Sequence, residues 1–243
     1  WGPRKILAWV ARKHPQIVRE LPAASTVGDL FHRERLVEPR RRRRPATHPG
    51  TRPLEAAAPN DVWCADYKGE FRLLNGVYCY PFTLTDAFSR FLLQCQAEHS
   101  TSLLGAMQAL TVAFRRYGLP WAIRTDNGTP FVGHGLSGLS QLGVWWMKLG
   151  IVHQRIQPAR PDQNGRHERM HRTLKAECAR PPEASFPAQQ ARLDAFGEEF
   201  NQERPHEALG QQTPASHYRV STREFPKSIA PPEYPGHYEV RKV

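Results

Sequence analysis

The chain has 243 residues, of which 40% are apolar, so it can bury a substantial core in one main domain with smaller attachments. This composition excludes an intrinsically disordered chain. Lys and Arg number 34 against 23 Asp and Glu, and residues 1–60 alone contain 13 basic and 5 acidic side chains. The uneven positive charge predicts a polyanionic partner that meets mainly the N-terminal part.

The sequence gives no sign of a membrane or secretory segment. It contains no run of about 18 apolar residues and no secretory signal pattern. Because it opens on Trp1 rather than Met, we expect a further segment upstream. Its cysteines, Cys64, Cys79, Cys95 and Cys178, form no Cys-x-x-Cys pair and have no nearby His at zinc-site spacing. Four reduced, mostly buried thiols in a cytosolic protein are therefore expected.

Two short helices are predicted in residues 1–36, which we interpret as a partial helix-turn-helix DNA-binding domain. Pro3 can open the first helix, and His14 precedes the proline that ends it. Ser25 or Thr26 can cap the second helix, which would present basic side chains outward. A generic helical hairpin fits the same pattern about as well.

Residues 37–57 lack apolar periodicity and are rich in Arg and Pro, which is typical of an extended basic linker. The linker contains five consecutive arginines: Arg40, Arg41, Arg42, Arg43 and Arg44. Such a run can be merely solvated. Beside a candidate helix-turn-helix, contact with DNA phosphates is the preferred interpretation.

From Asp61 onward the pattern changes to strands and helices. Three strands are predicted over residues 62–71, 77–85 and 91–97, and the turn Asn75-Gly76 between the first two favours an antiparallel meander. Helices at 101–117, 139–149 and 162–180 alternate with strands at 121–125 and 151–156. This order predicts an α/β fold, an RNase H-like mixed five-stranded sheet flanked by helices.

Three acidic residues lie at informative places in these elements. Asp66 lies in the first strand, Asp126 at the carboxyl end of the fourth, and Glu168 on the last long helix of the core. Asn127 and Gly128 should shape the turn that aims Asp126, with Gly128 at positive φ. Taken singly, most acidic side chains are only solvated. If the first and fourth strands are neighbours, the three carboxylates can hold divalent metal ions.

The helix that carries Glu168 also offers candidate DNA contacts. Glu168, Arg172 and Lys175 share one face, which would present a carboxylate to a metal and two cations to phosphates. Asn164 lies where the helix begins, and amides there can receive a phosphate. The buried stripe of this helix is predicted to contain Met170, Leu174 and Cys178.

Several further polar residues leave alternatives open. Lys68 points to the same side of the first strand as Asp66 and can either contact phosphate or cover the sheet edge. Asp86 is an alternative metal ligand, although capping of the turn between two strands is favoured. His167 and His171 can assist proton transfer, but a surface or packing role is favoured.

Several ordered motifs of the chain resemble the integrase-type catalytic core of insertion-sequence transposases and retroviral integrases. The similarity spans about residues 58–218. The matching segments are Trp63-Cys-Ala-Asp66, Asp86-Ala-Phe-Ser-Arg90, Asp126-Asn-Gly128, Pro161-Asp-Gln-Asn-Gly-Arg-His-Glu168, His171-Arg-Thr-Leu-Lys-Ala-Glu177, and Asn201-Gln-Glu-Arg-Pro-His206 through Thr213-Pro214. Residues 219–243 then form a C-terminal extension, either a small β domain or a tail.

The resemblance implies that Asp66, Asp126 and Glu168 are the D-D-E ligands of two Mg²⁺ ions, for which Mn²⁺ can substitute. The implied activity is that of a DNA transposase, with 3′-end cleavage followed by strand transfer of a mobile element. The implied partner is double-stranded DNA, both the element ends and the target, bound by a homo-oligomer in the bacterial cytoplasm at the nucleoid. Alternatives are a metal-dependent nuclease that does not join strands and a domesticated DNA-binding repressor with a silent core.

One departure from the family pattern concerns loop length. The 41 residues between Asp126 and Glu168 exceed the number that the family often has. We expect the excess in the glycine-rich loop at residues 133–138. This expectation concerns the geometry of the loop and leaves the ligand assignment unchanged.

Overall fold

The computed structural model of the chain describes residues 1–37, 56–133, 140–156 and 165–229. The predicted phosphate-binding residues Arg40, Arg41, Arg42, Arg43, Arg44 and Asn164 lie outside the described residues. Most of the loop at residues 133–138 also lies outside them.

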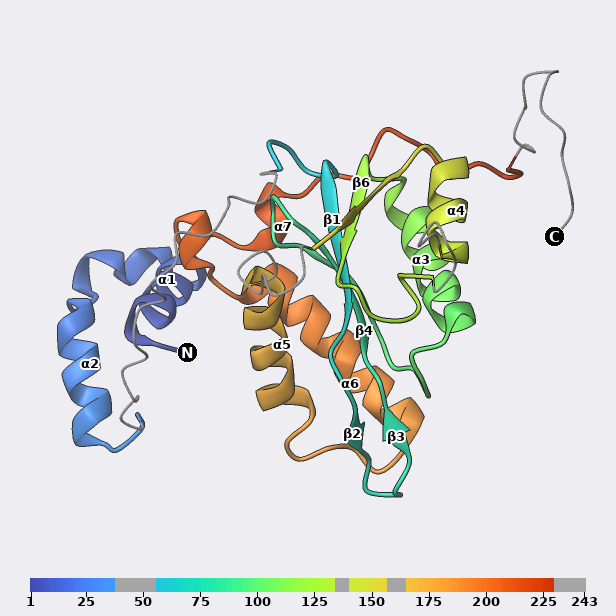
Figure 1. The fold of residues 1–243 in the computed structure, drawn as a ribbon. Coiled ribbons are helices and arrows are strands. Elements are labelled where there is room, and N and C mark those ends of the chain that lie inside the picture. The colour runs from blue at the N-terminus through green and yellow to red at the C-terminus, as the bar shows by residue number, and fades with distance from the viewer. Residues whose placement is uncertain (38–55, 134–139, 157–164, 230–243) are drawn as a thin grey trace, which may run out of the picture.

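The central sheet consists of β1 (Val62–Tyr67), β4 (Phe82–Asp86), β5 (Leu92–Gln96), β6 (Ala122–Thr125) and β7 (Val152–Arg155). The spatial order is β5-β4-β1-β6-β7 (Figure 1). β1 pairs antiparallel with β4, and β4 with β5, which confirms the predicted meander. β6 pairs in parallel with both β1 and β7. The predicted α/β class with a mixed five-stranded sheet is confirmed.

Two of the predicted strands are each divided into two pieces. The first ends at Tyr67 and resumes as β2 (Phe71–Arg72), because Gly69 adopts a φ of 84° that extended backbone does not use. The second divides into β3 (Tyr78–Cys79) and β4, separated by Pro81, which has no N–H to donate to a sheet. β2 and β3 form a hairpin of their own, and its predicted turn is confirmed by a φ of 83° at Gly76.

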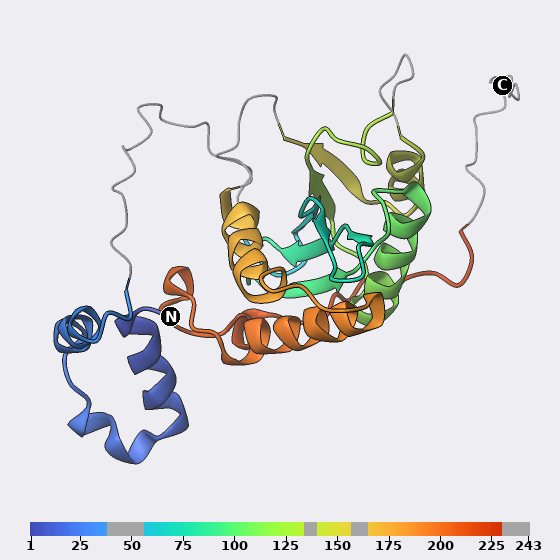
Figure 2. The same cartoon turned by 90° about the horizontal axis from the view of Figure 1, so that it is seen from below.

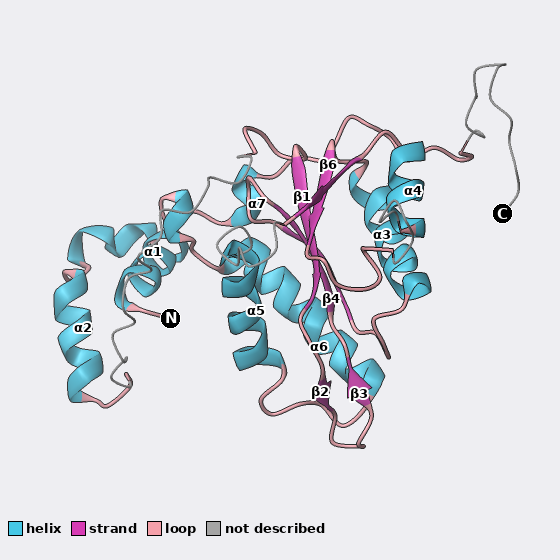
Figure 3. Cartoon of the chain, viewed as in Figure 1, coloured by secondary structure: helices cyan, strands magenta, loops and turns pink. Residues whose placement is uncertain are grey.

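Helices cover both faces of the sheet (Figures 2 and 3). One face carries α3 (Leu103–Tyr117) and α4 (Gln141–Lys148), and the other carries α5 (Gly165–Cys178) and α6 (Phe186–Glu198). The helix boundaries follow local chemistry. Ser102 and Ser140 cap α3 and α4 by accepting a backbone N–H three residues on, and Gly118 ends α3 at a φ of 75°.

The alternation of side chains along β1 gives the strand two different faces. Trp63 and Ala65 are buried in the core cluster beneath α3 and α4, whereas Asp66 points toward the α5 side. Trp63 also stacks on Phe114 and donates a hydrogen bond to Asn60 Oδ1 at 3.0 Å. The strand that carries Asp66 is therefore anchored on the face away from it.

Helix α5 has the two faces that its sequence predicts. Its buried stripe contains Met170, Leu174 and Cys178, which are at most 5% exposed and pack with residues of β5 and α6. Glu168, Arg172 and Lys175 are exposed. All four cysteines of the chain are free thiols, three of them buried.

The N-terminal segment contains α1 (Pro3–Lys13), a 3-10 helix η1 (Pro15–Glu20) and α2 (Ala24–Arg33). The predicted start of α1 is confirmed, with a proline in its first turn. The predicted serine or threonine cap of α2 is wrong, because Ala23 takes the cap position and makes no side-chain bond. The helices contact the core through Glu203, which accepts hydrogen bonds from Trp9 Nε1 at 3.0 Å and Lys13 Nζ at 2.7 Å.

The chain after α6 continues as a π-helix η3 (Glu199–Glu203), a 3-10 helix η4 (Glu207–Leu209) and α7 (Pro214–His217). Residues 218–229, called the strap below, then run along the core. Tyr218 donates a hydrogen bond to Asn60 Oδ1 at 2.9 Å, and Leu119 N donates to Arg223 O at 2.7 Å. Phe225 packs against the cluster beneath α3 and α4. Several residues just after the predicted end of the core thus contact the core, among them Arg219, Ser221, Arg223 and Phe225.

Candidate metal centre

Asp66 lies in β1, and Asp126 directly follows the neighbouring parallel strand β6. The two carboxylates could approach each other only if these strands were neighbours, as expected from the sequence. The register of β1 and β6 pairs Cys64 with Arg124. Continued by two residues, it sets Asp66 level with Asp126, which directly follows β6. Both carboxylates therefore arise at the carboxyl ends of adjacent strands, where the sites of α/β sheets are commonly found.

A tight turn holds the Asp126 side chain. Gly128 N donates a hydrogen bond to Asp126 Oδ1 at 3.0 Å, and Asn127 Nδ2 donates to Ile156 O at 2.7 Å. The expected positive φ at Gly128 is wrong, since this glycine is absent from the residues with φ above zero. A Cβ at Gly128 would lie only 3.1 Å from an oxygen of the Asp126 carboxylate. The turn therefore favours glycine because a larger side chain would crowd this carboxylate.

Glu168 lies in the first turn of α5 and is exposed. Three residues later, His171 faces the sheet, and its Nδ1 lies 3.9 Å from Asp66 Oδ2. Residues three apart on a helix are neighbours, so Glu168 lies beside His171 on α5. Among the described residues, the group of ligand atoms within 4.8 Å of one another comprises Asp66, His167 and His171.

A buried network of threonine and histidine lies between α5 and the sheet. Thr83 Oγ1 lies 2.7 Å from His167 Nε2 and 2.7 Å from His171 Nε2, and it donates to Asp66 O at 3.0 Å. Thr85 Oγ1 lies 3.1 Å from His167 Nδ1. The sequence left open whether the two histidines assist proton transfer or have a surface or packing role. In the structure both are buried and packed, with polar contacts to the threonines. Their spacing relative to Leu174 could have shown it, because they continue the buried stripe.

Burial keeps both histidines neutral. It lowers the pKa of His167 to about 3 and the pKa of His171 further, with the neighbouring His167 and Lys68 contributing to the second shift. A neutral imidazole has one N–H donor and one acceptor nitrogen. Each ring in this network therefore plays one definite role at each nitrogen.

Stability should consequently fall in mild acid. In the unfolded chain a histidine takes up a proton near pH 6.5, whereas folded His167 does so near pH 3, so stability is lost as pH falls between these values. At pH 5 the loss due to His167 is about 2 kcal/mol relative to pH 8. Urea unfolding of the wild type and of His167→Gln at both pH values measures it. An equal loss in both proteins would contradict this assignment.

Lys68 lies close to Asp66. Burial lowers the pKa of Lys68, Lys175 lowers it further, and the Asp66 carboxylate opposes the shift. Lys68, which directly follows β1, therefore lies near both Asp66 and Lys175 of α5. Arg172 is exposed on the same face of α5 as Lys175. Lys68, Arg172 and Lys175 therefore form a positively charged surface next to the region of Asp66.

Asp86 caps a turn, as the sequence favours. Its buried carboxylate accepts hydrogen bonds from Asn60 N at 2.8 Å and from both the N–H and the hydroxyl of Ser89 at 2.7 Å. Burial raises the pKa of Asp86, and these hydrogen bonds oppose the rise. Within β4 it pairs with Trp63, three residues before Asp66 on β1.

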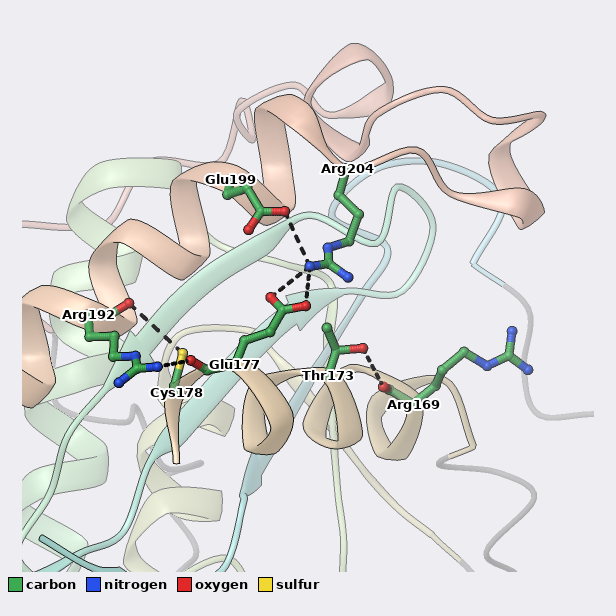
Figure 4. Close-up of polar contacts among 7 residues, drawn as sticks. All are labelled: Arg169, Thr173, Glu177, Cys178, Arg192, Glu199 and Arg204. Carbon is green, nitrogen blue, oxygen red and sulfur yellow. Dashed lines mark hydrogen bonds and ion pairs between the residues drawn. The ribbon is translucent and has the colours of Figure 1, made fainter. Parts of the chain in front are cut away.

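A charged clamp holds the far end of α5 (Figure 4). Arg204 Nη2 lies 2.5 and 2.7 Å from the two carboxylate oxygens of Glu177 and 3.2 Å from Glu199 Oε1. The Arg204 side chain is 7% exposed. Arg192 Nη2 donates to Glu177 O at 2.5 Å. The clamp joins two segments that the sequence singled out, one on α5 and one after α6.

Two family models described as integrase core domain match the chain, one over residues 56–161 and the other over residues 149–214. The matched region contains Asp66, Asp126 and Glu168. Among the described residues, none of the helices combines the length and the apolar character needed to cross a membrane.

Proteins of bacterial insertion elements are similar to the chain. An uncharacterized 31.7 kDa protein of insertion element IS407 from Burkholderia multivorans is 30% identical over 159 residues, 65% of this chain and 55% of that protein. An uncharacterized 39.2 kDa protein of insertion element IS476 from Xanthomonas euvesicatoria is 30% identical over 203 residues, 82% of this chain and 56% of that protein. The chain spans about half the length of these relatives.

Retroviral integrases share the fold. The catalytic core domain of HTLV-2 integrase, solved in complex with magnesium, matches 69% of this chain and 100% of that domain, with 19% identity and a TM-score of 0.50. A chain of the simian T-cell lymphotropic virus intasome matches 97% of this chain and 80% of its own length, with 17% identity and a TM-score of 0.58.

Proposed function

Residues 56–214 belong to the integrase core domain family, and on this basis we propose that the chain is a DNA transposase whose catalytic residues are Asp66, Asp126 and Glu168. The observation that carries the proposal is the level placement of Asp66 and Asp126 on adjacent parallel strands. Glu168 completes the set from the first turn of α5, the helix that packs over Asp66 through His171.

The donor set fits hard divalent cations. Asp66, Asp126 and Glu168 offer carboxylate oxygens, which Mg²⁺ and Mn²⁺ prefer. Asp66 lies in β1 and Asp126 directly follows β6, so the sheet holds the backbone of the first and anchors that of the second. When bound there, two such ions supply charge stabilisation for both the entering and the leaving oxygen of an in-line displacement at phosphorus. The residues of the chain orient these ligands and the DNA.

The proposed reaction has two steps at one site. In the first, a water oxygen bonds to the phosphorus at the element end, the bond from phosphorus to the element's 3′ oxygen breaks, and that strand is left with a 3′-hydroxyl. In the second, this hydroxyl oxygen bonds to a phosphorus of target DNA and displaces the target's own 3′ oxygen. Each step exchanges one phosphodiester bond, so neither requires an oxidant or a covalent protein intermediate.

The basic residues near the site are assigned to DNA. Lys68 lies near Asp66 and near Lys175, and Arg172 shares a face of α5 with Lys175, so phosphates next to the reacting one would meet cations. Asn164 and the run from Arg40 to Arg44 are proposed to extend this contact, as are the N-terminal helices acting as a helix-turn-helix. We further propose that a homo-oligomer bridges the two element ends.

A strand-transfer assay tests the function. The chain is incubated with Mg²⁺, a labelled pre-cut DNA end taken from the borders of the element that encodes it, and a target plasmid. Joined product is expected. Cleavage of uncut ends without joining would support the metal-dependent nuclease instead, and binding without either reaction would support a repressor with a silent core.

A further inference from the structure

The hydrogen bonds around Thr83 determine which ring nitrogens of the two histidines carry protons. A hydroxyl has one proton to donate and two lone pairs that accept. The Thr83 hydroxyl must donate its hydrogen bond to Asp66 O, because a carbonyl oxygen can only accept one. Both neighbouring nitrogens, His167 Nε2 and His171 Nε2, must therefore donate their protons to Thr83 Oγ1.

This assignment leaves Nδ1 of each neutral ring as an acceptor. For His167, the Nδ1 lone pair is satisfied by the hydroxyl of Thr85 at 3.1 Å. For His171, the polar group that Nδ1 faces within the described part of the chain is Asp66 Oδ2 at 3.9 Å. That oxygen also carries lone pairs and no proton when the carboxylate is ionised. Two acceptors thus face each other across a short gap.

We propose that His171 Nδ1 is a ligand of the metal ion held by Asp66, so that this ion has a mixed nitrogen and oxygen shell. Two ligands each about 2.1 Å from one ion lie roughly 3 to 4 Å apart, which the 3.9 Å separation fits. A cation between them also replaces the repulsion of two facing lone pairs by two attractions. His167 is excluded as a ligand because both of its nitrogens are engaged by hydroxyl groups.

The Thr83 bond has a further consequence for this site. A ligating histidine commonly donates its other ring N–H to an acceptor, which sets its tautomer and orientation. His171 already makes this contact to Thr83, and the same hydroxyl holds the backbone of Asp66. Thr83 therefore positions both proposed ligands at once.

An imidazole ligand changes the metal preference of the site. Imidazole nitrogen suits transition metals, whereas Mg²⁺ selects oxygen. The ion at Asp66 should accordingly favour Mn²⁺ or Zn²⁺ over Mg²⁺ more strongly than a shell made only of carboxylates would. The inference deepens the proposed function, since it rests on a metal at Asp66, but its measurement does not require DNA or turnover.

Electron spin echo spectroscopy of Mn²⁺ bound to the full chain tests the proposal. Protein labelled with ¹⁵N in histidine should show a nitrogen coupling to Mn²⁺. The coupling should vanish in His171→Gln, whose amide nitrogen can still donate to Thr83 but which lacks a group at the Nδ1 position. We expect this variant to bind Mn²⁺ about tenfold more weakly or worse, with a smaller effect on Mg²⁺.

Two further variants keep the test decisive. His171→Asn puts an amide oxygen near the Nδ1 position and should retain Mn²⁺ without nitrogen coupling, so it serves if His171→Gln does not fold. His99→Gln changes an exposed histidine that stacks on Phe186, and it should leave the coupling intact. Wild-type protein that binds no Mn²⁺, Mn²⁺ without nitrogen coupling, or a coupling that survives in His171→Gln would each overturn the proposal.

The outcomes also separate this inference from the function on which it rests. Strand transfer by a protein without nitrogen coupling would retain the transposase and remove His171 from the ligand set. Nitrogen coupling in a protein that neither cuts nor joins DNA would retain the ligand and remove the transposase.

Discussion

Glu168→Gln should abolish strand transfer while leaving DNA binding close to that of the wild type. The amide keeps the shape of the side chain but removes the charge and one ligand of the proposed metal pair. We expect the substitution to remove about 4 kcal/mol of transition-state stabilisation, which corresponds to about a thousandfold lower rate of joining. The rate of joined product from pre-cut ends, and the mobility shift of the same DNA, measure the two properties on one sample.

Glu198→Gln is the matched control for this substitution. Glu198 is likewise an exposed helical glutamate, but it lies on α6, outside the candidate centre. The control should join strands at the wild-type rate. If Glu168→Gln joins strands within tenfold of the wild type, Glu168 is not a ligand of the reacting site. A loss of DNA binding equal to the loss of joining would instead make Glu168 a residue of the binding surface.

Arg204→Glu should destabilise the core by about 5 kcal/mol, because it places a third carboxylate beside Glu177 and Glu199 in a position that is nearly closed to water. Since domains are typically stable by only about 5–15 kcal/mol, much of the protein should unfold at moderate temperature. Urea unfolding followed by tryptophan fluorescence measures the change. Because the clamp holds the end of α5, the same variant should also lose strand transfer.

The control for this reversal of charge is Arg115→Glu, on the exposed side of α3. It makes the same change in net charge, and an exposed substitution of this kind should alter stability by less than about 1 kcal/mol. Equal destabilisation by the two variants would mean that net charge matters rather than the clamp. A stable Arg204→Glu protein would show that the two glutamates do not depend on this guanidinium.

Local patterns in the sequence predicted most elements of the core because apolar periodicity and helix ends are local properties. Ser102 and Gly118 bound a helix that was expected within two residues of its observed ends. The interruptions at Gly69 and Pro81 were not predicted, although both residue types commonly break strands. The predicted cap at Ser25 or Thr26 was wrong because the helix already begins at Ala24, so both residues lie inside its first turn.

The candidate site depends on contacts between segments that are distant in the sequence. Alternation along β1 indicates from sequence which side chains share a face with Asp66. The parallel pairing of β1 with β6 has no local signal, because it joins residues about sixty positions apart. His167 and His171 were harder to place. Their spacing continues the buried stripe of α5, yet histidine is often found at a surface. The hydroxyls of Thr83 and Thr85, which are distant in the sequence, supply hydrogen bonds that favour their burial.

The strap has a consequence for the order in which the molecule is built. Its residues bond to Asn60, Leu119 and Pro120, and Arg223 also donates to Leu149 O at 3.0 Å. During synthesis the ribosome releases these residues after the whole sheet and all the helices that cover it. Until the strap has emerged, a nascent chain leaves the core beside Phe114 uncovered on the side where Phe225 packs, so this part of the core closes only after the strap has been synthesised.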